Sequence, residues 1–311
     1  MARPQHGIFT EGTRTHHHLE YVLAEGVDDH EITEALTAVR VANADHRTAG
    51  GTNLVIGFGP MMWDRVREGT STPQPVPFPG YATPDGRHEA PASQRDIWVW
   101  VHGASTDIVI DVVRNVDRAL SAIADLVLDV PGFVYHDSRD LTGFIDGTAN
   151  PRIDEAAMVA TLPDGSPGAG GSCAMTMRFV HDLDAFDELA VADQELVIGR
   201  TKDESVQLDA TVKPADAHIA RAEVADDDGE ELAVYRRSVP WATAASQGLH
   251  FVSFGADLAR FDLQLRHMYG LVDDGVTDRL LDFTSATTGS FWFCPSVDDL
   301  DEIAPLPEDD D

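Results

Sequence analysis

Cysteine is scarce in this 311-residue sequence, and what there is stands far apart. Only Cys173 and Cys294 occur, and neither belongs to a Cys-x-x-Cys or Cys-x-x-Cys-His pattern. Such a sequence excludes a disulfide-stapled scaffold, a cysteine-held iron–sulfur cluster and a covalently attached c-type haem. It favours a reducing compartment.

Long apolar runs are also missing. The longest, Asn53–Pro60 and Asp96–Gly103, have the length of strands and are far too short to cross a bilayer. The first twelve residues contain no apolar signal core, twin-arginine pair or small-residue cleavage pattern. Hydrophobic residues nevertheless make up 43% of the chain, which is typical of a globular protein. We therefore expect a cytoplasmic protein that does not bind membranes.

Positive charge is scarce, and lysine in particular is limited to Lys202 and Lys213. With 22 basic and 54 acidic residues, the formal net charge is −32. This excludes most nucleic-acid binding, because phosphate contacts need clusters of Lys and Arg. The acidic residues are spread along the whole chain, and their mutual repulsion weakens when salt screens it. This pattern favours a halophile that accumulates salt over an ordinary acidic surface.

The first half of the chain alternates between strand and helix patterns. Its order is β-α-β-β-α-β, with an irregular Pro/Gly-rich loop at Pro73–Pro91. This order predicts an α+β, ferredoxin-like fold, in which an antiparallel sheet carries both helices on one face. The expected strands are His16–Leu23, Asn53–Gly59, Asp96–His102 and Gly132–His136, and the expected helices follow Asp28 and Ser105.

The second half repeats the pattern less clearly. The expected strands are Cys173–Val180, Glu231–Arg237, Leu249–Phe254 and Ser290–Phe293, and the expected helices are one after Asp182, Asp257–Tyr269 and Asp278–Ser285. We predict two ferredoxin-like halves related by duplication. Their expected limits are 1–151 for the first half, 152–172 for a linker, 173–305 for the second half and 306–311 for an acidic tail.

The most informative motif is Gly143-Phe144-Ile145-Asp146-Gly147-Thr148-Ala149-Asn150-Pro151. Two glycines bracket Asp146 and a proline ends the run, so a tight loop presents one carboxylate. Taken alone, this pattern is more often a plain turn with a capping aspartate.

The stretch Tyr135–Pro151, with Ser138-Arg139-Asp140-Leu141 before the loop, resembles the signature loop of the dye-decolorizing peroxidases, in the branch without secretion signals. Other segments resemble this family in the same order along nearly the whole chain: Pro4–Gly7, Gly12–Glu20, His181–Leu183, Gln194–Glu195, Ile198–Lys202, Ala217–Arg221, Tyr235–Pro240, Gly248–Phe254 and Leu280–Gly289. The resemblance implies an oxidoreductase with one non-covalent haem b per chain, bound in the second half. It would reduce hydrogen peroxide and oxidise small phenols or dyes one electron at a time.

The resemblance also implies roles for single residues. His218 is expected as the axial iron ligand, since neutral imidazole suits iron. Its other ring nitrogen needs a carboxylate to hold it, and Asp282 is the expected partner. On the open face, Asp146 would move the peroxide proton and Arg236 would stabilise negative charge on the departing oxygen.

Three neighbouring positions leave alternatives open. Arg237 adjoins Arg236, but strand alternation places the two on opposite faces, so we prefer Arg236. Arg200 stands in a segment that contacts haem propionates in relatives, although an exposed loop arginine is nearly as good an explanation. Ser238 replaces the Asn of many relatives and would bond peroxide or water with a shorter reach.

Two further groups have simpler explanations. His16-His17-His18 suggests a metal site, but only His16 and His18 share a strand face and no third ligand is evident, so a structural strand is favoured. Four aromatic residues could pass electrons from bulky donors to the haem, although packing is the commoner role: Tyr235, Trp241, Tyr269 and Trp292.

Rival functions share parts of this pattern. A haem-binding protein for storage or iron recovery would need His218 but no acid–base pair on the open face. A small-molecule-sensing regulator built from two such halves would bind no haem. Chlorite-decomposing enzymes share the architecture but lack the Asp-bearing loop. The sequence does not decide between a monomer and a homo-oligomer.

Overall fold

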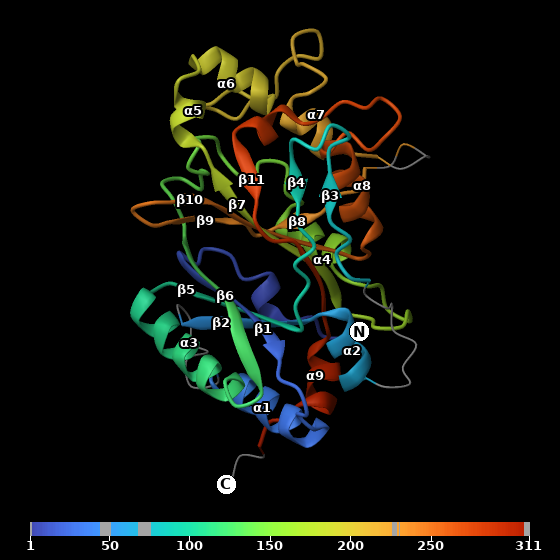
Figure 1. The fold of residues 1–311 in the computed structure, drawn as a ribbon. Coiled ribbons are helices and arrows are strands. Elements are labelled where there is room, and N and C mark those ends of the chain that lie inside the picture. The colour runs from blue at the N-terminus through green and yellow to red at the C-terminus, as the bar shows by residue number, and fades with distance from the viewer. Residues whose placement is uncertain (1, 44–50, 68–75, 226–228, 230, 308–311) are drawn as a thin grey trace.

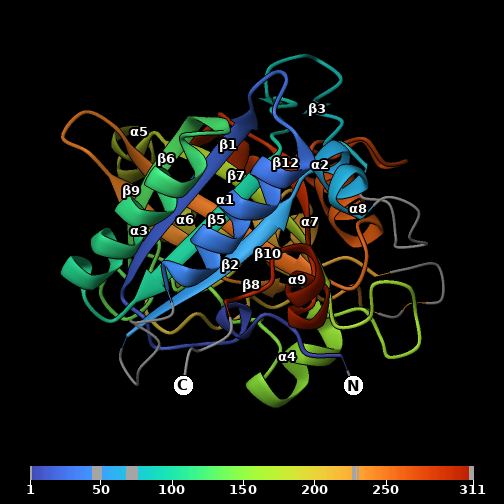
Figure 2. The ribbon, with the colours of Figure 1, turned by 90° about the horizontal axis from the view of Figure 1, so that it is seen from below.

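The computed structural model describes residues 2–43, 51–67, 76–225, 229 and 231–307. In the first half, four strands pair in the antiparallel order β6-β1-β5-β2. Helices α1 and α3 lie together on one face of these strands (Figures 1 and 2). The elements are β1 (Thr15–Leu23), α1 (Asp29–Val41), β2 (Thr52–Phe58), β5 (Ile97–Gly103), α3 (Thr106–Leu120) and β6 (Ala124–Phe133). The predicted ferredoxin-like half is confirmed.

Local sequence explains both helices. Asp28 caps α1, since its side chain accepts a hydrogen bond from the Glu31 backbone N–H while the Glu31 side chain accepts one from the Asp28 N–H. Helix α3 buries Val109, Val112 and Val116, which recur at helical spacing on its sheet-facing side. Burial of these stripes holds the two helices on the sheet.

The second half repeats the strand order of the first. Strands β7 (Ser172–His181), β8 (Tyr235–Arg236), β10 (Gln247–Gly255) and β12 (Ser290–Cys294) pair in the order β12-β7-β10-β8. Counted along the chain within each half, both orders are fourth, first, third, second. The helices of this half are short: α5 (Leu183–Asp187), α6 (Val191–Ile198), α7 (His218–Ala222) and α8 (Ala259–Met268).

The two halves meet along strands and through a buried aromatic layer. Strand β12 pairs with β7 and, at Phe293↔Phe58, with β2, so one 10-stranded sheet runs through the molecule. Trp98 and Trp100 from β5 pack with Phe254 and Trp292 from the second half, and all four are fully buried. The limits predicted for the halves and the linker stay predictions.

Several predicted elements are wrong. The expected helix Asp278–Ser285 is a 3-10 turn, η3 (Arg279–Asp282), followed by β11 (Thr284–Ala286), which pairs with β7. Backbone pairing of Thr284–Ala286 with β7 therefore prevails over the apolar spacing that predicted a helix. Of the expected strand Gly132–His136, only Gly132 and Phe133 belong to a strand, as the last two residues of β6. The expected strand Glu231–Arg237 is reduced to β8, and a further strand, β9 (Val239–Ala242), follows it.

Other elements lie where none was expected. The loop predicted over Pro73–Pro91 contains a hairpin, β3 (Tyr81–Ala82) and β4 (Glu89–Ala90), while its residues 73–75 lie outside the described residues. The remaining elements are η1 (His6–Ile8), α2 (Pro60–Val66), α4 (Ile153–Ala160) and α9 (Val297–Ile303). In the described part of the chain, every helix is too short or too polar to cross a bilayer.

Candidate active site

A cavity with about 800 Å³ of empty space, part of it open to solvent, lies in the second half of the chain. Alternate residues of two neighbouring strands form one wall, because side chains two apart share a sheet face. These are Met175, Met177 and Phe179 from β7 and Leu249 and Phe251 from β10. Leu265 and Met268 from α8 and Leu280 and Leu281 from η3 line the rest. The walls are therefore mainly apolar.

His218 is the first residue of α7 and lines this cavity. Its Nδ1 lies 2.7 Å from Oδ2 of Asp278, a side chain that is almost fully buried. A carboxylate only accepts hydrogen bonds, so Nδ1 carries a proton, and in the neutral ring Nε2 keeps its lone pair. Burial lowers the pKa of His218, but the charge and hydrogen bond of Asp278 outweigh it and raise the pKa above its ordinary value.

The carboxylate that holds His218 is not the predicted one. Asp282 is exposed and lies 3.2 Å from Nε2 of His88 and 3.7 Å from Nη1 of Arg87. Asp278 takes the role because it caps η3, with Oδ1 accepting from the Leu280 N–H at 2.9 Å and Oδ2 free for His218. The prediction of Asp282 is wrong.

Asp146 lies in the expected tight loop and lines the cavity. Gly143 and Gly147 on either side have φ angles of 88° and 83°, a conformation that favours glycine. The Asp146 N–H donates to the Ser138 carbonyl at 2.9 Å, which closes the loop. Burial raises the pKa of Asp146, against the lowering effect of Arg236, and nearby Asp140 raises it further. This carboxyl group can hold a proton at higher pH than an ordinary aspartate.

Arg236 lines the same cavity from β8. Asn150, at the end of the Asp146 loop, binds its backbone in both directions: the Arg236 N–H donates to Oδ1 at 2.9 Å, and Nδ2 donates to the Arg236 carbonyl at 2.8 Å. Nε of Arg236 is buried and has no hydrogen-bond partner among the described residues. Arg237 points away, donating to the carbonyls of Ile8 and Thr10 at 2.6 and 2.7 Å. The structure thus brings Asp146 and Arg236 to one cavity.

Two predicted residues lie outside the wall of this cavity. Ser238 lines an adjoining outer pocket that also contacts Asp146 and Arg236, and its Oγ accepts from the Val252 N–H at 3.2 Å. Arg200 donates to Glu223 at 2.9 Å and to the Ser205 carbonyl at 3.1 Å. A cofactor-binding role for either residue stays a prediction.

Sequence reasoning missed two pairs. One is the clamp between Asn150 and Arg236. The other is Asp140 and His181, whose Oδ1 and Nε2 lie 3.1 Å apart, with His181 lining the cavity. Asn150 and Asp140 both stand in the segment that resembles the family's signature loop. Their partners, Arg236 and His181, are 86 and 41 positions away along the chain. Only folding brings such partners together.

The histidines of the His16–His18 stretch and the candidate aromatic residues make packing contacts in the protein interior. His16 and His18 are buried and stack on Trp100 of the aromatic layer, as expected for one strand face. Trp241 donates to the Phe179 carbonyl at 3.0 Å, and the Arg178 guanidinium lies 3.7 Å from the centre of its ring. Packing contacts therefore account for His16, His18 and Trp241, and an electron-transfer role for the aromatic residues stays a prediction.

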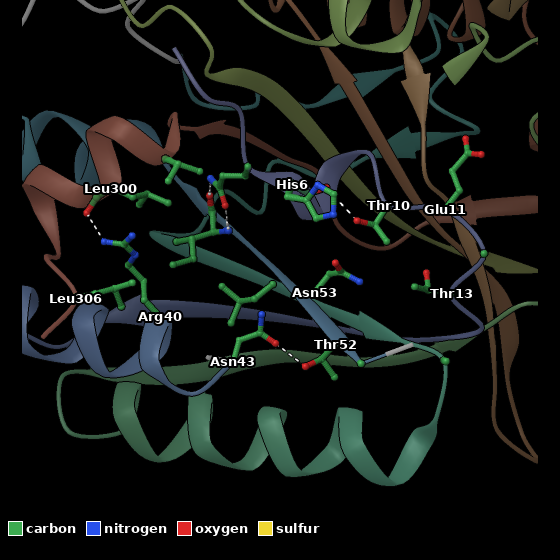
Figure 3. A pocket seen from close by; sticks show the side chains of 18 residues that line it. His6, Thr10, Glu11, Thr13, Arg40, Asn43, Thr52, Asn53, Leu300 and Leu306 are labelled. Atoms are coloured by element: carbon green, nitrogen blue, oxygen red, sulfur yellow. Dashed lines mark hydrogen bonds between the residues drawn. The ribbon is translucent and has the colours of Figure 1, made fainter. Parts of the chain in front are cut away.

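A larger pocket, with about 1450 Å³ of empty space, lies in the first half (Figure 3). Its polar side chains mainly join segments of the chain: Arg40 donates to the Leu300 carbonyl at 2.8 Å, and Thr52 donates to Asn43. Thr10 likewise donates to the His6 carbonyl at 3.2 Å. The smaller cavity therefore has the stronger claim to chemistry, because it joins His218, Asp146 and Arg236.

Comparison with known proteins agrees with this geometry. Two family profiles match the chain, "Dyp-type peroxidase, N-terminal" over residues 5–134 and "Dyp-type peroxidase, C-terminal" over residues 137–299. The chain belongs to the dye-decolorizing peroxidase family. A dye-decolorizing peroxidase of Mycolicibacterium paratuberculosis is 37% identical over 259 residues, which cover 82% of this chain and 72% of the relative.

Solved structures of dye-decolorizing peroxidases share the whole fold. A Dyp-type peroxidase from Shewanella oneidensis superposes with a TM-score of 0.91 at 31% identity, covering 97% of this chain and 99% of that chain. A variant of DypB from Rhodococcus jostii RHA1, solved in complex with haem, gives a TM-score of 0.90 at 33% identity, covering 97% and 100%.

The cavity of this peroxidase fits a haem group. A macrocycle needs flat apolar walls, and β7, β10 and α8 supply them. The iron needs one strong axial donor, and His218 offers Nε2 with its tautomer set by Asp278. A bound peroxide needs polar groups, and Arg236 keeps a buried Nε–H that has no hydrogen-bond partner in the described part of the chain.

Proposed function

We propose that this chain reduces hydrogen peroxide at a haem b held by His218, and that Asp146 and Arg236 carry the proton transfer and charge stabilisation. The chain is a haem-dependent peroxidase of the dye-decolorizing family. The observation that carries the residue roles is the meeting of His218, Asp146 and Arg236 in one apolar cavity.

On the proximal side, the role of the protein is to orient the ligand. Asp278 accepts a hydrogen bond from Nδ1–H of His218 and raises the basicity of the ring, so Nε2 becomes the better electron-pair donor to iron. Haem b, when bound there, supplies the iron that binds peroxide and accepts electrons from the reducing substrate. The residues that would hold it are His218 and the apolar side chains of β7, β10 and α8.

On the distal side, Asp146 takes the proton from one peroxide oxygen and delivers it to the other. Arg236 stays cationic and stabilises the negative charge that develops on the departing oxygen. Hydrogen peroxide accepts two electrons and two protons and becomes two water molecules. Two molecules of a small aromatic or dye-like donor each supply one electron.

The distal residues favour turnover over haem storage or iron recovery. A haem carrier needs an axial ligand but no proton-transfer group. Here the backbone bond from Asp146 to Ser138 closes the Asp146 loop, and Asn150 holds the backbone of Arg236 at the same cavity. Such preorganisation serves a reaction.

The test uses haem-loaded protein in concentrated KCl. We expect Arg236→Leu to slow the reaction with one equivalent of peroxide by about 10²–10³-fold, and Asp146→Asn by about 10²–10⁴-fold, as followed by stopped-flow absorbance. Both variants should keep the haem absorption band, and exposed Arg266→Leu should match wild type. An unchanged peroxide reaction in both distal variants would refute the proposed roles.

We also propose a cytoplasmic location. Cys173 and Cys294 are both free and buried, which suits a reducing compartment. Fractionation of the native cells checks this directly.

A further inference from the structure

A second carboxylate–histidine pair lies at the cavity, and the proposed reaction leaves it without a role. Nε2 of His181 lies 3.1 Å from Oδ1 of Asp140, and its Nδ1 lies 2.7 Å from Oγ1 of Thr284. His181 is 9% exposed and lines the cavity together with Asp146. The imidazole is therefore fixed at both ring nitrogens.

The bonds of His181 determine where its protons are. Asp140 accepts only, so Nε2 carries a hydrogen and donates it. Thr284 has one hydroxyl proton and two neighbours, Nδ1 of His181 at 2.7 Å and the Val180 carbonyl at 3.3 Å. When the His181 ring is neutral, the Thr284 hydroxyl donates to Nδ1. When the ring is cationic, the hydroxyl accepts from Nδ1–H and donates to the Val180 carbonyl. In both states the ring supports a negative charge on Asp140.

Asp140 is built to stay ionised. Its Oδ2 accepts from the Thr142 N–H at 3.0 Å and from the Thr142 hydroxyl at 2.6 Å. Burial by itself raises the pKa of Asp140, but the hydrogen bond and charge of His181 and the two bonds of Thr142 outweigh it and hold the pKa below its ordinary value. Two residues thus keep a charge at a partly buried position.

The fold brings this charge near Asp146. Arg139 pairs with Ile145, and the Asp140 N–H donates to the Phe144 carbonyl at 2.9 Å, so the segment folds back on itself. Asp146 is also influenced by Arg236 from β8 and by His218 from α7. Other titratable or charged groups line the outer pocket beside it: Glu11, His16, Arg139 and Arg237.

We propose that Asp140 is a positioning residue, kept ionised by His181, whose negative charge sets the pH range in which Asp146 releases its proton. A like charge nearby disfavours the ionised carboxylate of Asp146, while Arg236 favours it. The two opposing neighbours together tune the acid–base group. This inference rests on the role proposed above for Asp146.

The first experiment measures the rate constant for peroxide with the haem-loaded full chain across pH, at constant high KCl. Asp146 acts first as a base, so the rate falls on the acid side as it takes up a proton. We expect Asp140→Asn, which keeps the Thr142 contacts, to move this fall to lower pH by roughly one unit, about tenfold faster at a fixed pH on the slope. Asp146→Asn should remove the slope.

The second experiment tests whether His181 acts through Asp140. His181→Phe removes the hydrogen bond and charge that support the Asp140 carboxylate, so this carboxyl group binds a proton more readily and the slope moves in the same direction as in Asp140→Asn. His181→Gln keeps a hydrogen-bond donor for Asp140, so its slope should lie closer to that of wild type. The Asp140→Asn/His181→Phe double variant should match Asp140→Asn, because the two changes remove one interaction.

The third experiment needs no haem. Carboxyl ¹³C resonances of labelled aspartates are followed against pH in the haem-free protein, with Asp140 assigned by its absence in Asp140→Asn. His181→Phe should raise the midpoint of the Asp140 titration and His181→Gln should raise it less. An Asp140 midpoint that does not move, or a pH slope that shifts additively in the double variant of the second experiment, would overturn the role of His181.

The two proposals fail in different ways. A slope that survives in Asp146→Asn contradicts the role of Asp146 and removes the basis of this inference. A slope that disappears in Asp146→Asn but superimposes on wild type in Asp140→Asn contradicts only the positioning role. Circular dichroism and the haem absorption band show that each variant is folded and loaded.

Discussion

The two halves share one strand order but use their helices differently. In the first half, α1 and α3 are 13 and 15 residues long and lie directly on the sheet. In the second half, α5, α6 and α7 have only 5, 8 and 5 residues, and a long segment separates α6 from α7. One topology therefore places helices directly on the sheet in one half and leaves a cavity between sheet and helices in the other.

The difference lies in what covers the sheet. Val112 and Val116 of α3 fill the space over the first sheet and are completely buried. In the second half, the residues of β7 that face the helix layer meet the cavity, and a helix begins at His218 beside it. A bound haem would complete this core. The second half should therefore gain stability from its ligand, whereas the first is complete by itself.

The change with the largest expected effect on this contrast is His218→Ala. It removes the imidazole that we propose as the iron ligand, so haem should be lost on gel filtration or keep an altered absorption band. His267→Ala, on α8 but outside the wall of the cavity, is the control and should bind haem as wild type does. Normal haem retention and spectrum in His218→Ala would show that another residue is the ligand.

A smaller effect separates the two acidic residues of the closing segment. Asp278→Asn weakens the partner of His218 and should lower haem affinity or peroxide reactivity by about 10–100-fold. Asp282→Asn, which alters an exposed contact with His88, should leave both unchanged. Haem titration and stopped-flow rates measure the two variants side by side. The reverse ranking would restore Asp282 as the partner.

The smallest effect concerns stability. In the haem-free protein, Leu36→Ala in the closed core of the first half should lower the free energy of unfolding by about 2–5 kcal/mol. Met177→Ala, at the wall of a cavity already present, should cost less, because the methionine has fewer packing contacts to lose. Urea unfolding followed by circular dichroism compares them. Equal losses would mean that the second half is closed without haem.

Much of the site could be predicted because its residue types follow from the chemistry. An axial imidazole, a distal carboxylate and a fixed cation are needed, and the family resemblance places them at His218, Asp146 and Arg236. Strand alternation also separated Arg236 from Arg237, whose guanidinium binds the carbonyls of Ile8 and Thr10. Local rules suffice where a choice depends on neighbours in the chain.

The choice between Asp278 and Asp282 shows where local rules stop. On the helix predicted for this segment, positions four apart share a face, so either carboxylate could meet His218. The segment instead tightens into η3 and continues as β11, which pairs with β7. This geometry leaves Asp278 at the cap and turns Asp282 toward His88.

The sequence by itself determined the two ferredoxin-like halves and the Asp146 loop, since these depend on periodicity and glycine placement, and the family resemblance is what predicts His218 as the axial ligand. Only the tertiary structure decided that Asp278 holds His218, that Asn150 clamps Arg236 and that His181 meets Asp140. Each of these contacts joins residues at least 41 positions apart in the chain. Their partners are chosen by how strands and loops pack, and no local pattern encodes that packing.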